Sequence, residues 1–67
     1  MMIKLTNMSN PGVLDMPVYI NTNHIASVSE QKSDQGGIIT VVYCVNGAFW
    51  VVEETISEVI RMINESH

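Results

Sequence analysis

The dipeptide Asn46-Gly47 joins two segments, 38–45 and 48–53, that are rich in β-branched and aromatic residues. Asn-Gly is the preferred pair for a two-residue type I′ hairpin turn, in which both central residues need a positive φ. The sequence therefore predicts an antiparallel hairpin in which Val45 faces Ala48. The pairs expected further out are Cys44 with Phe49, Tyr43 with Trp50, Val42 with Val51 and Val41 with Val52.

Both faces of this predicted hairpin are mainly apolar. In the expected register, one face carries Ile39, Val41, Tyr43, Val45, Ala48, Trp50 and Val52. The other face carries Ile38, Thr40, Val42, Cys44, Phe49, Val51 and Glu53. A half-exposed antiparallel sheet would instead alternate apolar and polar residues. Three arrangements would account for the second apolar face: a sheet that curls into a partial barrel, a second subunit, or an open groove for a peptide or lipid.

Three segments before the hairpin, 2–6, 16–20 and 24–30, predict further strands. Pro17 has no N–H for a β-ladder, which suits the start of a strand or the edge of a sheet. Segments 7–15, 21–23 and 31–37 have the Asn, Ser and Gly content that is typical of turns and loops. In the first of these, Pro11 and Gly12 exclude a regular strand or helix.

The end of the chain predicts one α-helix from Ile56 to about Asn64. Thr55 and Glu58 have the spacing of a capping box, in which each side chain accepts a hydrogen bond from the other residue's free N–H. The apolar residues of the segment recur at helical spacing, and Met62 flanks their stripe. That stripe consists of Ile56, Val59, Ile60 and Ile63. The expected fold is a single α+β domain over 1–67, with a four- to five-stranded antiparallel sheet of β-hairpins and one C-terminal helix.

Charge and cysteine content narrow the class of partner and compartment. The chain has seven acidic and three basic residues, and the basic ones are scattered, so no basic patch can bind phosphates. We therefore expect no nucleic-acid partner. The single cysteine fits a reducing compartment, and neither a signal-peptide pattern nor a membrane-spanning apolar stretch is present. We expect a cytoplasmic protein without membrane insertion.

No set of residues has the spacing of a catalytic, metal or cofactor site. His24 and His67 are the only histidines, and a metal site needs three or four ligands. Cys44 lies in a predicted strand, where a cysteine is usually a small hydrophobe. Glu53 and Glu54 precede the capped helix, whose N-terminus favours negative charge. We expect no enzymatic activity, no catalytic residue, no cofactor and no metal.

The length of the chain favours self-association. A chain of 67 residues buries only about 60% of the surface that its unfolded state exposes, so its stability alone is marginal. We expect a homo-oligomer, most often a dimer, formed through one face of the hairpin. Aromatic side chains with a polar group suit such interfaces, which favours the face with Tyr43 and Trp50. The candidate interface residues are Tyr43, Trp50, Val41, Val52 and Val45.

Short motifs along nearly the whole chain point to a family. They are Met2–Thr6, Val18–Asn21, Ile25, Ile39–Val41, Asn46-Gly47, Val51–Thr55 and Glu58–Ile60. With these motifs the sequence resembles the small FlbD-like flagellar proteins of the swarming-motility (SwrD) type. The resemblance implies a non-enzymatic protein-interaction module with a role in motility, which binds an unidentified cytoplasmic protein. Loops 7–15 and 31–37 are longer than in that family, and the alternative is a phage- or mobile-element-encoded regulator that binds and modulates a host protein.

Overall fold

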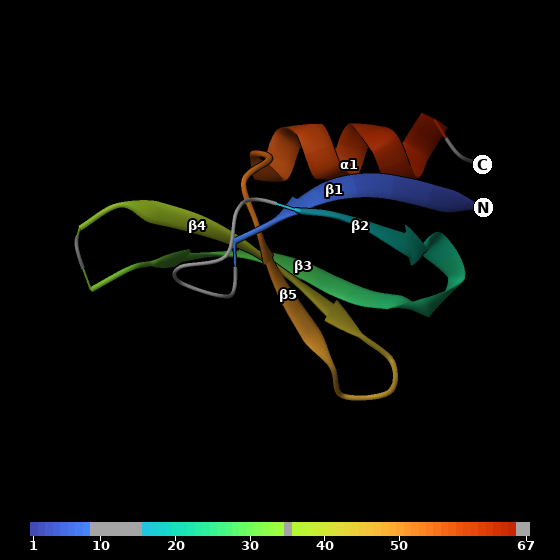
Figure 1. Ribbon diagram of the computed structural model, residues 1–67, viewed down its shortest axis with the longest axis horizontal. Coiled ribbons are helices and arrows are strands. Elements are labelled where there is room, and N and C mark those ends of the chain that lie inside the picture. Colours follow the sequence, from blue (N-terminus) through green and yellow to red (C-terminus); the bar gives the residue numbers. More distant parts are fainter. Residues whose placement is uncertain (9–15, 35, 66–67) are drawn as a thin grey trace.

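A computed structural model describes residues 1–8, 16–34 and 36–65. Within these residues the strands form one antiparallel sheet in the order β2-β1-β5-β4-β3, and one α-helix follows (Figure 1). The elements are β1 (Met2–Asn7), β2 (Met16–Asn21), the 3-10 helix η1 (Thr22–His24), β3 (Ile25–Lys32), β4 (Ile38–Cys44), β5 (Phe49–Val52) and α1 (Ile56–Glu65). The expected α+β fold is confirmed. Of the predicted loop 7–15, residues 9–15 lie outside the described residues.

The hairpin between β4 and β5 differs by one residue from the expected register. Val42, not Tyr43, pairs with Trp50. The loop holds three residues instead of two, because the Cys44 N–H donates to the Ala48 carbonyl at 2.8 Å and the Gly47 N–H to the Cys44 carbonyl at 3.0 Å. In this loop Gly47 alone has a positive φ, at +88°. A three-residue loop that ends in a left-handed glycine is the next most common hairpin connection, and the predicted type I′ turn is wrong.

A shift of one residue moves the side chains of one strand to the opposite face relative to its neighbour. Two faces of the β4–β5 hairpin follow from the observed pairs. The inner face, which faces the core, carries Thr40, Val42, Cys44, Trp50 and Val52. The outer face carries Ile39, Val41, Tyr43, Phe49 and Val51.

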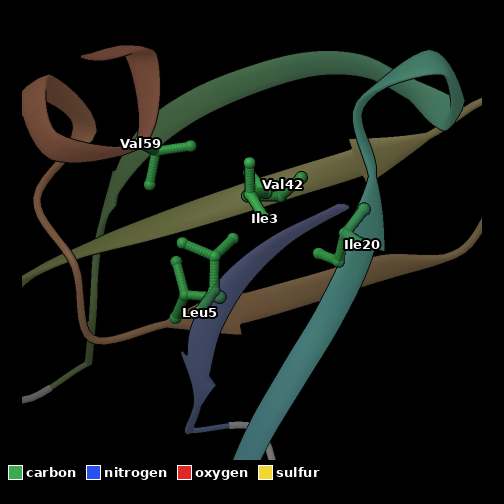
Figure 2. Packing of buried hydrophobic residues seen from close by; sticks show 6 residues of the cluster. Ile3, Leu5, Ile20, Val42 and Val59 are labelled. Atoms are coloured by element: carbon green, nitrogen blue, oxygen red, sulfur yellow. The ribbon is translucent and has the colours of Figure 1, made fainter. Parts of the chain in front are cut away.

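The core lies inside a sheet that curls around it. The cluster at its centre consists of Ile3, Leu5, Ile20, Val42, Val52 and Val59 (Figure 2). Ile25 and Val28 of β3 pack against this same cluster, although β3 and β2 are at opposite ends of the strand order. Helix α1 contacts both β1 and β3, which are not neighbours in the sheet. The sheet therefore encloses the core from several sides, and the helix lies across the remaining opening.

Helix α1 begins at the predicted residue and with the predicted cap. The Thr55 N–H donates to Glu58 Oε1 at 3.1 Å, and the Glu58 N–H donates to Thr55 Oγ1 at 3.2 Å. Val59 is fully buried, whereas Ile60 is 45% exposed, so the expected place of Ile60 in the buried stripe is wrong. Met62 packs against the core instead. The apolar face of the helix is thus rotated toward Met62.

Strands β1 and β5 meet along a short seam. Asn7 pairs with Val52, and the Glu53 N–H donates to the Thr6 carbonyl at 3.0 Å. Beyond the end of β5, the carboxylate of Glu54 accepts hydrogen bonds from the Thr6 N–H at 2.9 Å and from Thr6 Oγ1 at 3.0 Å. One side chain thus extends the contact between the N-terminal hairpin and the segment that leads into α1.

We expect Gly47→Ala to lower the free energy of unfolding by about 1–2 kcal/mol, because an L-residue is strained in the left-handed region. A Cβ at Gly47 would meet nothing within 4 Å, so the loss reports backbone strain alone. Gly37→Ala is the matched control, since its Cβ would lie 3.6 Å from Ser33 Oγ and its φ is not positive. Urea denaturation checks both variants, and equal losses would contradict the assigned turn.

Replacement of Glu54 by Ala is expected to cost about 2 kcal/mol, because the Thr6 N–H loses a charged acceptor in a partly buried place. Glu54→Gln keeps one acceptor oxygen and should lose less. Glu65→Ala removes the same charge from the exposed last turn of α1 and should change stability by a few tenths of a kcal/mol. Thermal unfolding followed by circular dichroism measures the stability of all three variants. A loss of stability in Glu54→Ala no larger than that in Glu65→Ala would contradict the stabilising contact between Glu54 and Thr6.

Candidate functional site

The residues expected to form one interface do not share one face of the hairpin. Tyr43 and Val41 lie on the outer face, while Trp50 and Val52 lie on the inner face. Val45 belongs to the turn and is exposed. The prediction that Tyr43 and Trp50 lie side by side is therefore wrong, and the cause is the additional residue in the loop.

The inner face is occupied by the protein's own core. Val52 is only 1% exposed, and Trp50 is half-buried and packs against the central cluster. Helix α1 and strand β1 lie on this side and cover the inner face around Val52, whereas near the turn Cys44 and Trp50 line an open groove. A partner at this hairpin would use the outer face, an edge or this groove.

The outer face has an aromatic pair at its exposed end. The rings of Tyr43 and Phe49, which are opposite each other in the ladder, have centroids 6.1 Å apart and planes inclined by 42°. Such tilted pairs are favourable arrangements of aromatic rings. Gln31 Nε2 donates to the Tyr43 hydroxyl at 2.8 Å, which helps to hold the phenol in place. Phe49 is 59% exposed, whereas Val41 on the same face is 3% exposed. The outer face therefore has a buried centre beside an accessible aromatic ring.

A notch of about 590 Å³ lies where β4 extends past the end of β5. The last pair of the two strands is Thr40 with Val52, and the chain then leaves β5 toward α1 while β4 continues to Ile38. This β4 notch is lined by Met8, Glu30, Ile38, Ile39, Thr40, Val52, Glu53, Glu54 and Thr55. Its described lining thus combines apolar side chains with three carboxylates and contains neither Lys nor Arg.

The β4 notch was not predicted from the sequence. It arises from the unequal length of the two strands, since β4 has seven residues and β5 only four. The acidic pair Glu53-Glu54 directly follows the shorter strand. A short strand paired with a long one leaves part of the long one without a neighbour, and the residues after the short strand form the wall of the opening.

A second groove, of about 540 Å³, lies near the β4–β5 turn and brings His24 and Cys44 to the same surface. His24 is exposed and Cys44 is half-buried. These two potential ligands are fewer than the three or four of a protein zinc site. Across residues 1–8, 16–34 and 36–65, no three His, Cys, Asp or Glu side chains gather closely enough to hold a metal ion. His67 lies outside the described residues.

No helix in the described part of the chain has the length and apolar character needed to cross a membrane. No family model matches this sequence, and no curated protein or solved structure matches it. A function can be proposed from two features of the structure. They are the outer face, with the exposed ring of Phe49, and the β4 notch, with its carboxylates.

Trp50 and Phe49 are neighbours on β5 whose side chains lie on opposite faces, so replacing each of them tests which face enters the core. Trp50→Ala should lower the free energy of unfolding by about 2–3 kcal/mol, because it removes a half-buried ring from the core side. Phe49→Ala should cost less than about 1 kcal/mol, because the ring is mostly exposed. Urea denaturation at low micromolar protein, where association contributes little, checks the order. A larger loss for Phe49→Ala would contradict the observed register.

Proposed function

We propose that this protein is a small, non-enzymatic interaction module of the cytoplasm, which resembles the FlbD-like motility proteins and acts as a homo-oligomer. The observation that carries the proposal is the outer face of the β4–β5 hairpin. This face is apolar, includes the exposed ring of Phe49, and lies on the side opposite the core. A second copy that packs on it would remove this ring from water.

The chemistry of the outer face suits contact between two copies. Burial of the part of Phe49 that is still exposed stabilises a complex by about 1–2 kcal/mol, and a twofold axis buries two such rings. The Tyr43 hydroxyl accepts a hydrogen bond from Gln31, so its own hydrogen remains available to donate. Tyrosine is enriched at protein interfaces because its ring is apolar and its hydroxyl is polar. The face can thus supply both the apolar area and a polar contact at the rim.

In this proposal the homo-oligomer binds a further cytoplasmic protein, and no bond in that protein is made or broken. The small size of the chain supports such a role, since a module of this length buries little surface of its own and gains stability from association. Self-association centred on Phe49 and Tyr43 also leaves the helix and the part of the β4 notch around Ile38 and Glu30 to contact other molecules.

Sedimentation equilibrium tests the proposed oligomer. We expect the wild type to form dimers at tens of micromolar, and Phe49→Lys to raise the dissociation constant at least about tenfold, since it places a charge in the interface. Tyr19→Lys is a matched control, because Tyr19 is 58% exposed and Phe49 59% exposed, and both lie on strands. A wild-type mass of 7.5 kDa that persists at several hundred micromolar would overturn the proposal.

A further inference from the structure

We propose that the β4 notch binds an extended, positively charged segment of a partner protein, which adds to the free edge of β4 as a further strand. The inference rests on the proposed role as an interaction module, but it does not depend on self-association through the outer face. Three features of the notch lead to it: the direction of the backbone at Ile38, the exposed apolar side chains, and the carboxylates.

The backbone groups of Ile38 face the notch. In an antiparallel ladder, successive residues direct their N–H and C=O groups to opposite neighbours. Cys44 bonds across the hairpin to Ala48 of the β5 side, and Thr40 pairs with Val52. Ile38 is two residues before Thr40 and six before Cys44, and even spacing along a strand preserves the direction of the backbone groups. Its N–H and C=O therefore also point toward the β5 side.

Because β5 ends at Val52, the N–H and C=O of Ile38 form a short open strand edge between Thr40, which pairs with Val52, and Gly36, whose N–H donates to the Ser33 carbonyl. An open strand edge is the element that peptides use when they add to a sheet.

The apolar side chains at this edge are accessible. Ile38 is 67% exposed, and Ile39 and Met8 also line the notch. The β3–β4 hairpin that carries Ile38 projects away from the rest of the molecule (Figure 1), so the protein's own core does not cover it. A two-stranded ribbon is only marginally stable in water by itself. A third strand beside β4 would cover apolar surface and supply the hydrogen bonds that the ribbon lacks.

The charge of the notch identifies the kind of segment. Glu30, Glu53 and Glu54 line it, and the Glu54 carboxylate is already held by Thr6. The whole chain has a formal net charge of -4, so a second copy brings like charge to this place. A segment with Lys or Arg brings opposite charge, and charge complementarity favours that encounter.

The strand pairing within the β3–β4 hairpin also indicates how side chains should alternate along the bound segment. Glu30 pairs with Thr40 and Lys32 pairs with Ile38, so these side chains lie on one side of the sheet, whereas Ile39 lies on the opposite side. An added strand presents alternate side chains to the two sides. A segment that alternates basic and apolar residues would therefore direct its cations to one side of the sheet and its apolar side chains to the other.

The test uses a fluorescein-labelled hexapeptide, Lys-Val-Lys-Val-Lys-Val, added to the full-length protein. We expect amide chemical-shift changes centred on residues 37–40 and 53–55. Fluorescence anisotropy should show binding that weakens as salt is added. Glu30→Gln and Glu53→Gln should each raise the dissociation constant by about twofold to fivefold. Glu65→Gln, which removes the same charge from the exposed end of α1, should leave it unchanged.

Two further peptides make the test decisive. Glu-Val-Glu-Val-Glu-Val should not bind, and the lysine peptide with alternate amides N-methylated on its pairing edge should bind at least about tenfold more weakly. Equal binding of the acidic peptide, indifference to N-methylation, or shifts centred on Tyr43 and Phe49 would each overturn the proposal. Peptide binding that survives in Phe49→Lys separates the notch from the self-association interface, whereas its loss in that variant would place the peptide at the interface and refute the notch.

Discussion

The three-residue loop that ends in the left-handed Gly47 sets the register of the β4–β5 hairpin. That loop sets Val42 opposite Trp50. From this one pairing follows the division of the hairpin into a face that enters the core and a face that does not. Had the loop been one residue shorter, the aromatic residues of β5 would have exchanged places, and Phe49 would have been directed to the core side.

Strand β4 is the element on which the other parts converge. Its inner side chains reach the core, its outer side chains surround Val41, and its backbone at Ile38 extends past the neighbouring strand. The arrangement depends on β5 ending early, and β5 ends at Val52 because the next residues turn toward the capped helix while Glu54 binds Thr6.

Local signals predicted the elements, and longer-range packing decided how they fit together. The capping box of Thr55 and Glu58 and the positions of the strands depend on neighbouring residues, so the sequence indicated them correctly. Asn-Gly serves both two- and three-residue loops, and the choice between them depends on which side chains fill the core. The predicted interface combined Tyr43 with Trp50, so a single extra loop residue invalidated the whole set. The β4 notch depends on where β5 ends relative to β4, and neither segment alone indicates that relative position.

The composition of the core has a consequence for folding cooperativity. Ile3, Leu5 and Ile20 come from the N-terminal hairpin, and the other three members of the central cluster come from β4, β5 and α1. The buried centre is therefore complete only when the two halves meet, and docking of the N-terminal hairpin and completion of the core are one event. Unfolding should be all-or-none, with slow amide exchange in both halves lost together. Cutting the chain between β2 and β3 would separate Ile3, Leu5 and Ile20 from the other members of the cluster, and binding of the two fragments would restore it.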